Sequence, residues 1–147
     1  MNTQDKIKKT RSTKDLIISL VVLLGGVAMC FSSDNTVLII GILFILGGIG
    51  AFFAMKTSFK VEGDNAVYQC KIINQPALRL DYTEDFLKGK TSTFEYIRGD
   101  GLMLYVYHNS DNTQGYALLK VFSDYDWKER GDLYKLNADQ INQLISI

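Results

Sequence analysis

The stretches LIISLVVLLGGVAMCF (16–31) and VLIIGILFILGGIGAFFAM (37–55) decide the fold of this chain. Neither contains a charged side chain, and only a polar turn, Ser32–Thr36, separates them. At ~1.5 Å per residue, two helices would reach ~24 Å and ~28 Å, compared with a hydrocarbon core of ~30 Å. The sequence therefore predicts a transmembrane helical hairpin over residues 16–55.

Two further segments flank the apolar region: a short tail, residues 1–15, and a longer segment, residues 56–147. The longer segment has enough residues for one small hydrophobic core, so we expect a separate soluble domain there. The formal net charge of the chain is zero, but the tail carries five Lys or Arg residues and two Asp residues. We expect this tail to lack regular structure and to lie beside anionic lipid headgroups. Since the domain is not basic, the charge pattern does not favour a nucleic-acid partner.

The distribution of basic residues predicts the orientation of the hairpin. Five Lys or Arg residues precede the first apolar stretch, and Lys56 and Lys60 follow the second. The Ser32–Thr36 turn holds one Asp and no basic residue. Basic flanks stay on the cytosolic side of a membrane. We therefore expect a multi-pass protein of the cell membrane with both termini in the cytosol.

A basic start followed by an apolar stretch is also typical of a secretory signal peptide. The stretch 16–31 is longer than the usual apolar region of a signal, and a second apolar stretch follows almost at once. The sequence Val27-Ala28-Met29-Cys30 resembles a lipoprotein cleavage site, but Met29 stands where those signals have a small residue. We therefore favour a spanning hairpin over a cleaved signal.

Glycines are concentrated in both apolar stretches. Close backbone approach at small residues, rather than the hydrophobic effect, holds helices together in lipid. Folding about the short turn places Gly26 level with Gly41, and Ser19 level with Gly48. The residues expected to pack helix against helix are Gly25, Gly26, Gly41, Gly47, Gly48 and Gly50. The alternative is that they pack against another copy of the chain or another membrane protein. Neither stretch contains Asp, Glu, Lys, Arg or His, which argues against an ion or proton pathway.

The domain begins with residues that alternate between apolar and polar. Ser58–Glu62 and Ala66–Ile73 have the composition of two strands, and Gly63-Asp64-Asn65 between them predicts a tight turn. Asp81 and Glu84 have the spacing of a capping box, which predicts a short helix over Tyr82–Lys88. We therefore expect a β-hairpin followed by one short helix.

Three further strands are expected to form an antiparallel meander. They are Thr91–Ile97, Leu102–Asn109 and Tyr116–Phe122, the first two joined by a turn at Arg98–Gly101. The last two are largely apolar on both faces, which is typical of a sheet covered on both sides. Next, the highly charged segment 123–132 is expected to be a loop before a last short strand, Leu133–Leu136.

The chain ends in a sequence typical of an amphipathic helix. Asn137 and Gln140 have capping-box spacing, and Ile141, Leu144 and Ile145 follow at helical intervals. The expected fold is therefore a two-helix transmembrane hairpin with a small α+β domain. Its antiparallel sheet should have five or six strands and be closed by a C-terminal helix.

The order of these elements is similar to that of bacterial membrane proteins in which two spanning helices precede a pleckstrin-homology-like barrel closed by a C-terminal helix. The likeness covers most of the chain but rests on no sequence motif. The helix expected at Tyr82–Lys88 departs from that layout because it interrupts the series of strands. The resemblance implies a closed barrel as the alternative to an open sheet.

Residue types that carry catalysis or bind metals are sparse. His108 is the only histidine, and Cys30 and Cys70 are expected at opposite faces of the membrane, where they cannot pair. Asp124 and Asp126 begin like a calcium loop, but a lysine occupies the next ligand position. No Walker loop, dinucleotide-binding motif, nucleophile elbow or zinc-protease motif occurs. We therefore predict no catalytic residue, no cofactor and no metal ligand.

Tyr125 and Trp127 stand among charged residues in the expected loop. Aromatic side chains in such a setting are typical of protein-interface anchors and of residues at the membrane interface. Equally, they could fold back over the edge of the sheet. Both interpretations stay open at the level of sequence.

The function predicted first is that of a non-enzymatic accessory or protein-interaction module at the cytosolic face of a membrane. The alternative is a membrane-anchored module that binds lipid or a small ligand. The expected partners are the lipid bilayer and another membrane or cytosolic protein, or a second copy of the chain. A flat apolar and aromatic patch on the domain would favour a protein partner, and a basic concave patch would favour lipid. A pocket with converging polar groups would favour an enzyme, the hypothesis ranked last.

Overall fold

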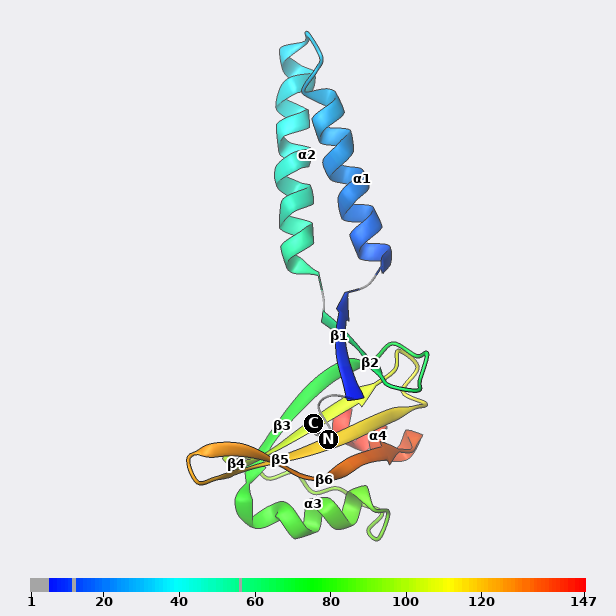
Figure 1. Cartoon of the computed structure of the whole chain (residues 1–147), viewed down its shortest axis with the longest axis vertical. Helices are drawn as coiled ribbons and strands as arrows, with labels where there is room; N and C mark the ends of the chain where they lie inside the picture. Colours follow the sequence, from blue (N-terminus) through cyan, green and yellow to red (C-terminus); the bar gives the residue numbers. More distant parts are fainter. Residues whose placement is uncertain (1–5, 12, 56) are drawn as a thin grey trace. The chain divides into compact units, whose positions relative to one another are not determined.

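The computed structural model describes residues 6–11, 13–55 and 57–147. The chain divides into two compact units: one is Lys9–Ser58, and the other holds the remaining residues on both sides of it. The helices and strands in chain order are β1 (Ile7–Arg11), α1 (Thr13–Met29), α2 (Asn35–Ala54), β2 (Thr57–Val61), β3 (Gln69–Pro76), the 3-10 helix η2 (Ala77–Arg79), α3 (Leu80–Leu87), β4 (Gly101–His108), β5 (Gly115–Ser123), β6 (Asp126–Leu136) and α4 (Ala138–Ile145) (Figure 1).

The first unit is dominated by the antiparallel helices α1 and α2 (Figure 1). Asp34 caps α2, because its carboxylate accepts a hydrogen bond of 2.8 Å from the Thr36 backbone N–H. Within the described residues, α2 is the one helix long and apolar enough to cross a membrane. Signal sequences and core helices of soluble proteins share such length and composition. The two-span hairpin therefore remains a prediction.

The prediction that the N-terminal tail lacks regular structure was wrong for Ile7–Arg11. These residues form β1, which pairs with β2 in a two-stranded sheet. The Glu62 backbone N–H also donates a hydrogen bond of 2.7 Å to the Lys6 carbonyl. The physical reason is that Ile7 packs on an apolar cluster of the domain, which a polar tail with one isoleucine does not reveal. Residues 1–5 of the predicted tail, and Lys56 of the predicted basic flank, lie outside the described residues.

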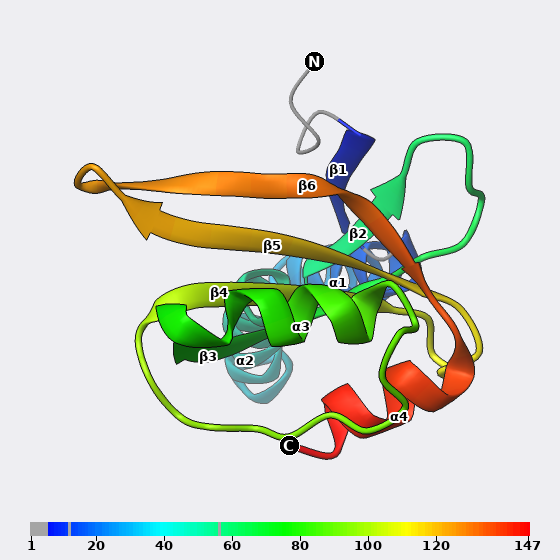
Figure 2. The ribbon, with the colours of Figure 1, turned by 90° about the horizontal axis from the view of Figure 1, so that it is seen from below.

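The second unit is built on an open four-stranded antiparallel sheet in the order β3-β4-β5-β6. Helices α3 and α4 cover one face of this sheet (Figure 2). Their contact is a fully buried core that includes Phe86, Leu104, Leu119, Ile141 and Leu144. This confirms the α+β class, the antiparallel pairing and the C-terminal helix that closes the core. The single sheet of five or six strands was wrong, because the six strands of the described residues form two sheets, one of four strands and one of two. The barrel alternative was wrong, because β3 and β6 are edges of the sheet and do not pair with each other.

The opposite face of the sheet carries a second, smaller core. Ile7 and Phe59, from the two-stranded sheet, pack there against Tyr68, Tyr107 and Leu118. The rings of Phe59 and Tyr107 meet edge to face at 5.3 Å. The central strands β4 and β5 are therefore covered on both sides over part of their length, as their apolar composition predicts.

The strand predicted at Thr91–Ile97, and with it the hairpin turn at Arg98–Gly101, was wrong. The segment 91–100 forms no strand, and β4 pairs instead with β3, from Pro76 opposite Gly101 to Gln69 opposite His108. The hairpin between β3 and β4 is therefore closed by a long connection that contains α3. Phe94 explains the aromatic composition of this connection, because its ring packs on Phe86 at 4.9 Å in the core.

The charged loop predicted at 123–132 was also wrong. Most of it belongs to β6, which follows β5 after the two-residue turn Asp124-Tyr125. Both turn residues have positive φ, 52° and 62°, as the turn type that suits the twist of a hairpin requires. Such turns are usually signalled by Asn-Gly, and Asp-Tyr lacks that signal. Gly131, with φ of 75°, lies where the register between β5 and β6 shifts.

Two smaller predictions were right in part, and a third is confirmed. The strand predicted at Ser58–Glu62 is β2, but its partner is β1, and only a single bridge from Phe59 to Tyr68 links it to the following segment. Asp81 does not cap α3, because η2 runs directly into that helix. The capping box of Asn137 and Gln140 is confirmed at the start of α4.

Candidate functional site

Helices α1 and α2 touch through backbone atoms at Gly26 and Gly41. A Cβ atom added to Gly26 would lie 2.7 Å from the Gly41 carbonyl oxygen, and one added to Gly41 would lie 2.8 Å from the Gly26 oxygen. Both distances are shorter than real carbon–oxygen contacts, so no larger residue fits without moving a helix. These two glycines therefore set the closest approach of the helices.

A second contact lies further along the pair. The Ser19 hydroxyl donates a hydrogen bond of 3.0 Å to the Gly48 carbonyl, and both residues are buried. Gly48 also leaves room for Leu23, whose Cβ would be 3.2 Å from an added Cβ. In apolar surroundings such a hydroxyl must find an acceptor, and here the other helix provides it.

The other three glycines predicted to pack the helices lie outside this contact. Cβ atoms added to Gly25, Gly47 and Gly50 would have no neighbour within 4 Å. The difference follows from helix geometry: Gly41 and Gly48 are seven residues apart, which is about two turns, and so share one face. Gly47 and Gly50 fall on another side of α2.

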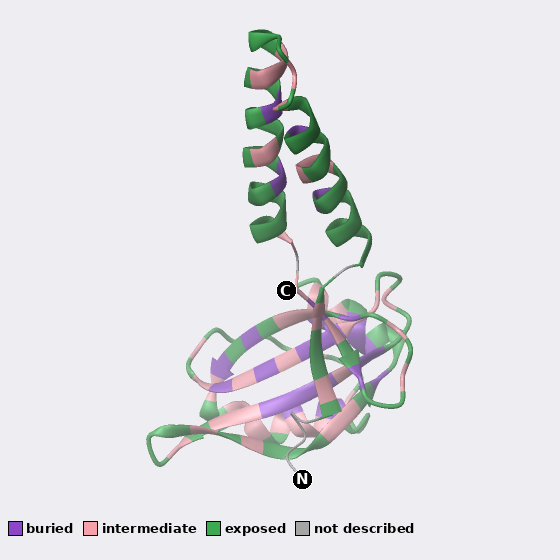
Figure 3. Cartoon of the chain, turned by 45° about the horizontal axis from the view of Figure 1, so that its top comes forward, coloured by how far each residue is buried: buried purple, intermediate pink, exposed green. Residues whose placement is uncertain are grey.

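Large apolar side chains of the helix pair point outward. Figure 3 shows the few buried residues of α1 and α2 facing each other, with exposed residues around them. Within the described chain, only 11 % of the most apolar stretch of α2 is buried. The exposed residues include Ile17, Ile18, Leu20, Val21, Leu24, Ile39, Leu43, Phe44, Leu46 and Phe53. Small residues thus lie at the closest contacts of the pair, and large apolar side chains lie on its outer surface. A helix pair in the core of a soluble protein has the reverse arrangement.

One part of the domain's sheet has no covering layer within the described residues. It lies on the same face as Tyr107 and Leu118, beyond their cluster, and we call it the uncovered face. Its residues, placed by the strand register, are Ile72, Met103, Phe122 and Trp127, with Tyr105 at its boundary, where Tyr105 also packs against that cluster. Ile72 is 51 % exposed and Phe122 48 % exposed.

The uncovered face is predominantly aromatic. The rings of Phe122 and Trp127 lie 5.4 Å apart, and the Lys120 ammonium lies 5.4 Å from the Tyr105 ring. The Tyr105 hydroxyl is 3.6 Å from the Met103 sulfur. A flat array of aromatic rings, methionine and one cation resembles the residue composition of protein interfaces.

The structure separates the two aromatic residues that the sequence singled out. Trp127 lies partly buried on the sheet against Phe122, so it belongs to the uncovered face. Tyr125 occupies the tip of the β5–β6 turn and is 98 % exposed. The two aspartates that resemble the start of a calcium loop have partners in the same turn. The Asp124 carboxylate pairs with Lys128, and the Asp126 carboxylate accepts a hydrogen bond from the Trp127 N–H.

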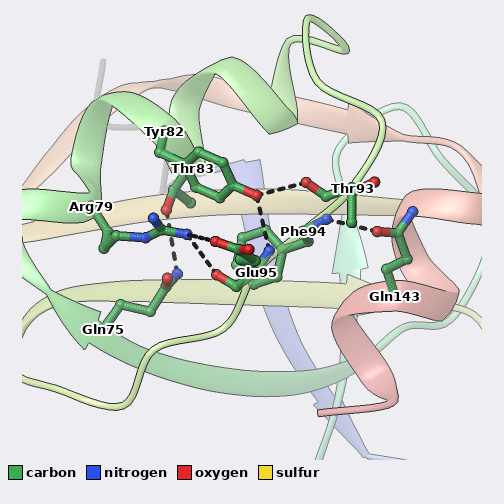
Figure 4. Close-up of polar contacts among 8 residues, drawn as sticks. All are labelled: Gln75, Arg79, Tyr82, Thr83, Thr93, Phe94, Glu95 and Gln143. Carbon is green, nitrogen blue, oxygen red and sulfur yellow. Dashed lines mark hydrogen bonds and ion pairs between the residues drawn. The ribbon is translucent and has the colours of Figure 1, made fainter.

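A polar network holds the segment that precedes β4 (Figure 4). The Arg79 guanidinium stacks over the Tyr82 ring at 3.8 Å and donates to the Glu95 carbonyl at 2.9 Å. The Tyr82 hydroxyl donates to the Thr93 carbonyl and accepts from the Glu95 N–H. On the other side, Gln143 of α4 accepts from the Phe94 N–H at 2.8 Å. Side chains therefore make the hydrogen bonds to the backbone of residues 93–95 that a neighbouring strand would make in a sheet.

The fixed segment lines a polar cleft beside the edge strand β3. This cleft has a volume of about 430 Å³, and its polar walls are Lys71 and Asn74 of β3 with Tyr96, Arg98 and Asp100 of the connection. Lys71 is already engaged, since its ammonium donates to the Ile145 carbonyl at the end of α4. The charges of opposite sign at Arg98 and Asp100 suit a small polar ligand better than a purely anionic one.

A carboxylate and two tyrosines form a further cluster under the smaller core. Asp64 accepts hydrogen bonds from the hydroxyls of Tyr68 and Tyr116 and from the Ala66 N–H. The Tyr68 hydrogen bond is the main cause that lowers the pKa of the Asp64 carboxyl, and burial is the main cause that raises the pKa of Tyr68. These contacts stabilise the turn after β2, a structural role.

The contacts of the histidine and of Cys70 indicate structural rather than catalytic roles. His108 Nδ1 shares a hydrogen bond of 2.8 Å with Asn112 Oδ1 in the β4–β5 turn. Burial raises the pKa of the Cys70 thiol to about 11, which disfavours the nucleophilic thiolate. Cys30 and Cys70 are both free thiols. In the described part of the chain, no group of three or more His, Cys, Asp or Glu residues is placed to hold a metal ion.

Comparison of the chain with protein-family models, with curated proteins and with solved structures gives no match.

The helix contact makes a prediction with a matched control. Gly41→Leu should force α1 and α2 apart and lower the free energy of unfolding by about 1–3 kcal/mol, the range for overpacked contacts. Gly47→Leu places the same side chain on the same helix where nothing lies within 4 Å, so its effect should be small. The measurement is the melting temperature of the full chain in a mild detergent. Equal melting temperatures for the two variants would contradict this packing.

Proposed function

We propose that this chain is a membrane-anchored, non-enzymatic interaction module. Its α1–α2 pair spans a bilayer as a hairpin, and its α+β domain stands at the cytosolic face to bind another protein. The domain boundary falls at the end of the second helix, near residue 56.

The observation that carries the anchor is the inside-out helix pair. Its closest contacts are made by Gly26, Gly41, Gly48 and the Ser19 hydroxyl, while exposed Leu, Ile, Val and Phe side chains cover its outside. Water would oppose so large a contiguous apolar surface. Lipid tails would solvate it, and in lipid small residues and an interhelical hydrogen bond are what hold helices together.

The orientation follows from the basic flanks. Lys8, Lys9, Arg11 and Lys14 lie before or at the start of α1, and the turn between the helices carries Asp34 and no basic residue. The positive-inside rule then keeps both termini, and with them the domain, in the cytosol. The free thiol of Cys70, in the domain, suits that compartment.

A protein partner is supported by the uncovered face and by Tyr125. The face presents Ile72 and Phe122 to solvent beside the partly buried Trp127, and an exposed tyrosine stands at the tip of the adjoining turn. Aromatic residues with low conformational entropy are typical of the centre of protein interfaces. A membrane-tethered domain could bind its partner weakly, because tethering raises the local concentration.

The second candidate function is binding of a small polar ligand in the cleft beside β3. Its supporting observation is the convergence of Arg98, Asp100 and Asn74 on one hollow. The cleft lies on a rigid support, since the side-chain network of α3 and α4 fixes the segment before it.

The orientation can be measured with single-cysteine variants in which Cys30 and Cys70 are replaced by alanine. Ser33→Cys places a thiol in the turn between the helices, and Leu78→Cys places one on the domain at a residue that is 96 % exposed. A membrane-impermeant thiol reagent added to intact cells should label position 33 and not position 78. Permeabilised cells should then show labelling of both. Labelling at position 78 in intact cells would invert the topology and remove the cytosolic-partner proposal.

The partner can be tested with a photoreactive amino acid at Tyr125, with Leu78 as the matched control site. Both side chains are almost fully exposed, but only Tyr125 adjoins the uncovered face. Irradiation of native membranes should give a cross-linked product of defined, higher mass from position 125 and not from position 78. Phe122→Glu in the same chain should abolish that product, because a charge would be buried in the interface. Equal products from both sites would contradict a specific interface at this face.

A further inference from the structure

An apolar groove opens between α1 and α2 where α1 begins and α2 ends. Its volume is about 410 Å³, and its walls are Leu16, Leu20 and Leu23 of α1 with Ile49, Phe52 and Phe53 of α2. Ser19 also lines it, but the Ser19 proton is already donated to the Gly48 carbonyl. The groove therefore offers hydrocarbon contacts along its length.

The groove exists because the small-residue contacts lie further along the pair. Gly26 and Gly41 bring the backbones together near the turn, and Ser19 and Gly48 meet about two turns away. Beyond them the helices spread apart, as Figure 1 shows. From Leu16 to Leu23 the groove extends about 10 Å along α1, at ~1.5 Å per residue.

Positive charge stands at the open end of the groove. The Arg11 guanidinium lies 4.8 Å from the centre of the Phe52 ring, which is itself one wall. Lys14 lies in the first turn of α1, which begins at Thr13 and whose first backbone N–H groups favour an anion. The acidic residue of that turn, Asp15, lines a different hollow with Ile18 and Ala51.

We propose that this groove holds one acyl chain of an anionic phospholipid, with the lipid headgroup beside Arg11 and Lys14. The inference rests on the proposed membrane-spanning hairpin. In a bilayer the tail gains little from the hydrophobic effect, because it leaves one apolar environment for another. The shape of the groove orders the tail, and the charge at its end selects the headgroup.

The test uses the full chain purified in a mild detergent. It is mixed with equal amounts of phosphatidylglycerol and phosphatidylcholine that carry the same acyl chains, and native mass spectrometry counts the lipid retained. One phosphatidylglycerol should be retained with about thirtyfold preference, the ratio that corresponds to two basic residues at an anionic surface. Arg11→Gln should lower the preference about fivefold, the contribution of one basic residue, and Arg11→Lys should keep it.

The groove itself is tested by Leu20→Trp, which fills it and should reduce the retention of both lipids. The matched control is Val21→Trp, which adds the same side chain at the next residue, exposed and outside the groove wall. Lys60→Gln controls for the loss of a basic residue elsewhere, since Lys60 is exposed on β2. Both controls should bind lipid as the unchanged chain does.

Three results would overturn the inference. They are equal retention of the two lipids by the unchanged chain, unchanged retention in Leu20→Trp, and a dimer that Leu20→Trp dissociates without loss of lipid. Alkaline carbonate extraction of membranes that contain the chain separates this failure from failure of the proposed function. Release into the supernatant would contradict the spanning hairpin, whereas a chain that stays in the membrane but shows no lipid preference contradicts only the lipid site.

Discussion

The close approach of α1 and α2 at Gly26 and Gly41 is the contact on which the helical unit depends. It brings the two backbones within van der Waals distance, and the Ser19–Gly48 hydrogen bond fixes the same register further along. Because these residues are small, the backbones approach closely and most of the large side chains point outward, while Leu23 and Ile45 contact the glycines of the opposite helix. One steric constraint thus accounts for the narrow contact, the apolar exterior and the groove at the far end.

The domain differs from the helix pair in that most of its apolar surface is buried. Its sheet is covered on both faces over much of its area. Helices α3 and α4 bury one face, and the strand pair β1–β2 contributes to the cluster on the other. What remains uncovered is confined to the region of Ile72, Phe122 and Trp127. Against so much protected surface, an exposed aromatic region is more informative than scattered exposed apolar residues would be.

The sequence predicts those parts of the structure that depend on local patterns. Two charge-free stretches indicate two helices, the residues from Asn137 to Ile145 indicate a capped amphipathic helix, and the β4 and β5 strands follow from their composition. Prediction from sequence fails where contacts between residues far apart in the chain determine the local structure. Residues 91–97 look like a strand, but side chains of Arg79, Tyr82 and Gln143 hold them as an extended connection. The turn at Asp124-Tyr125 lacks the usual glycine, so the sequence predicts only the end of β6, Leu133–Leu136, as a strand. At the helix contact, glycine content alone does not tell which glycines face the partner; a seven-residue spacing does.

The central claim, that lipid surrounds the helix pair, is tested most directly by a spin label at Leu43 in the chain reconstituted into liposomes. Leu43 is 62 % exposed on α2, so a label there should not disturb the helix contact. If lipid surrounds the helices, the label at position 43 should collide often with dissolved oxygen and rarely with a water-soluble nickel chelate, whereas a label at Leu78 on the domain should show the reverse. Equal access of the nickel chelate to positions 43 and 78 would show that water, not lipid, surrounds the helix pair.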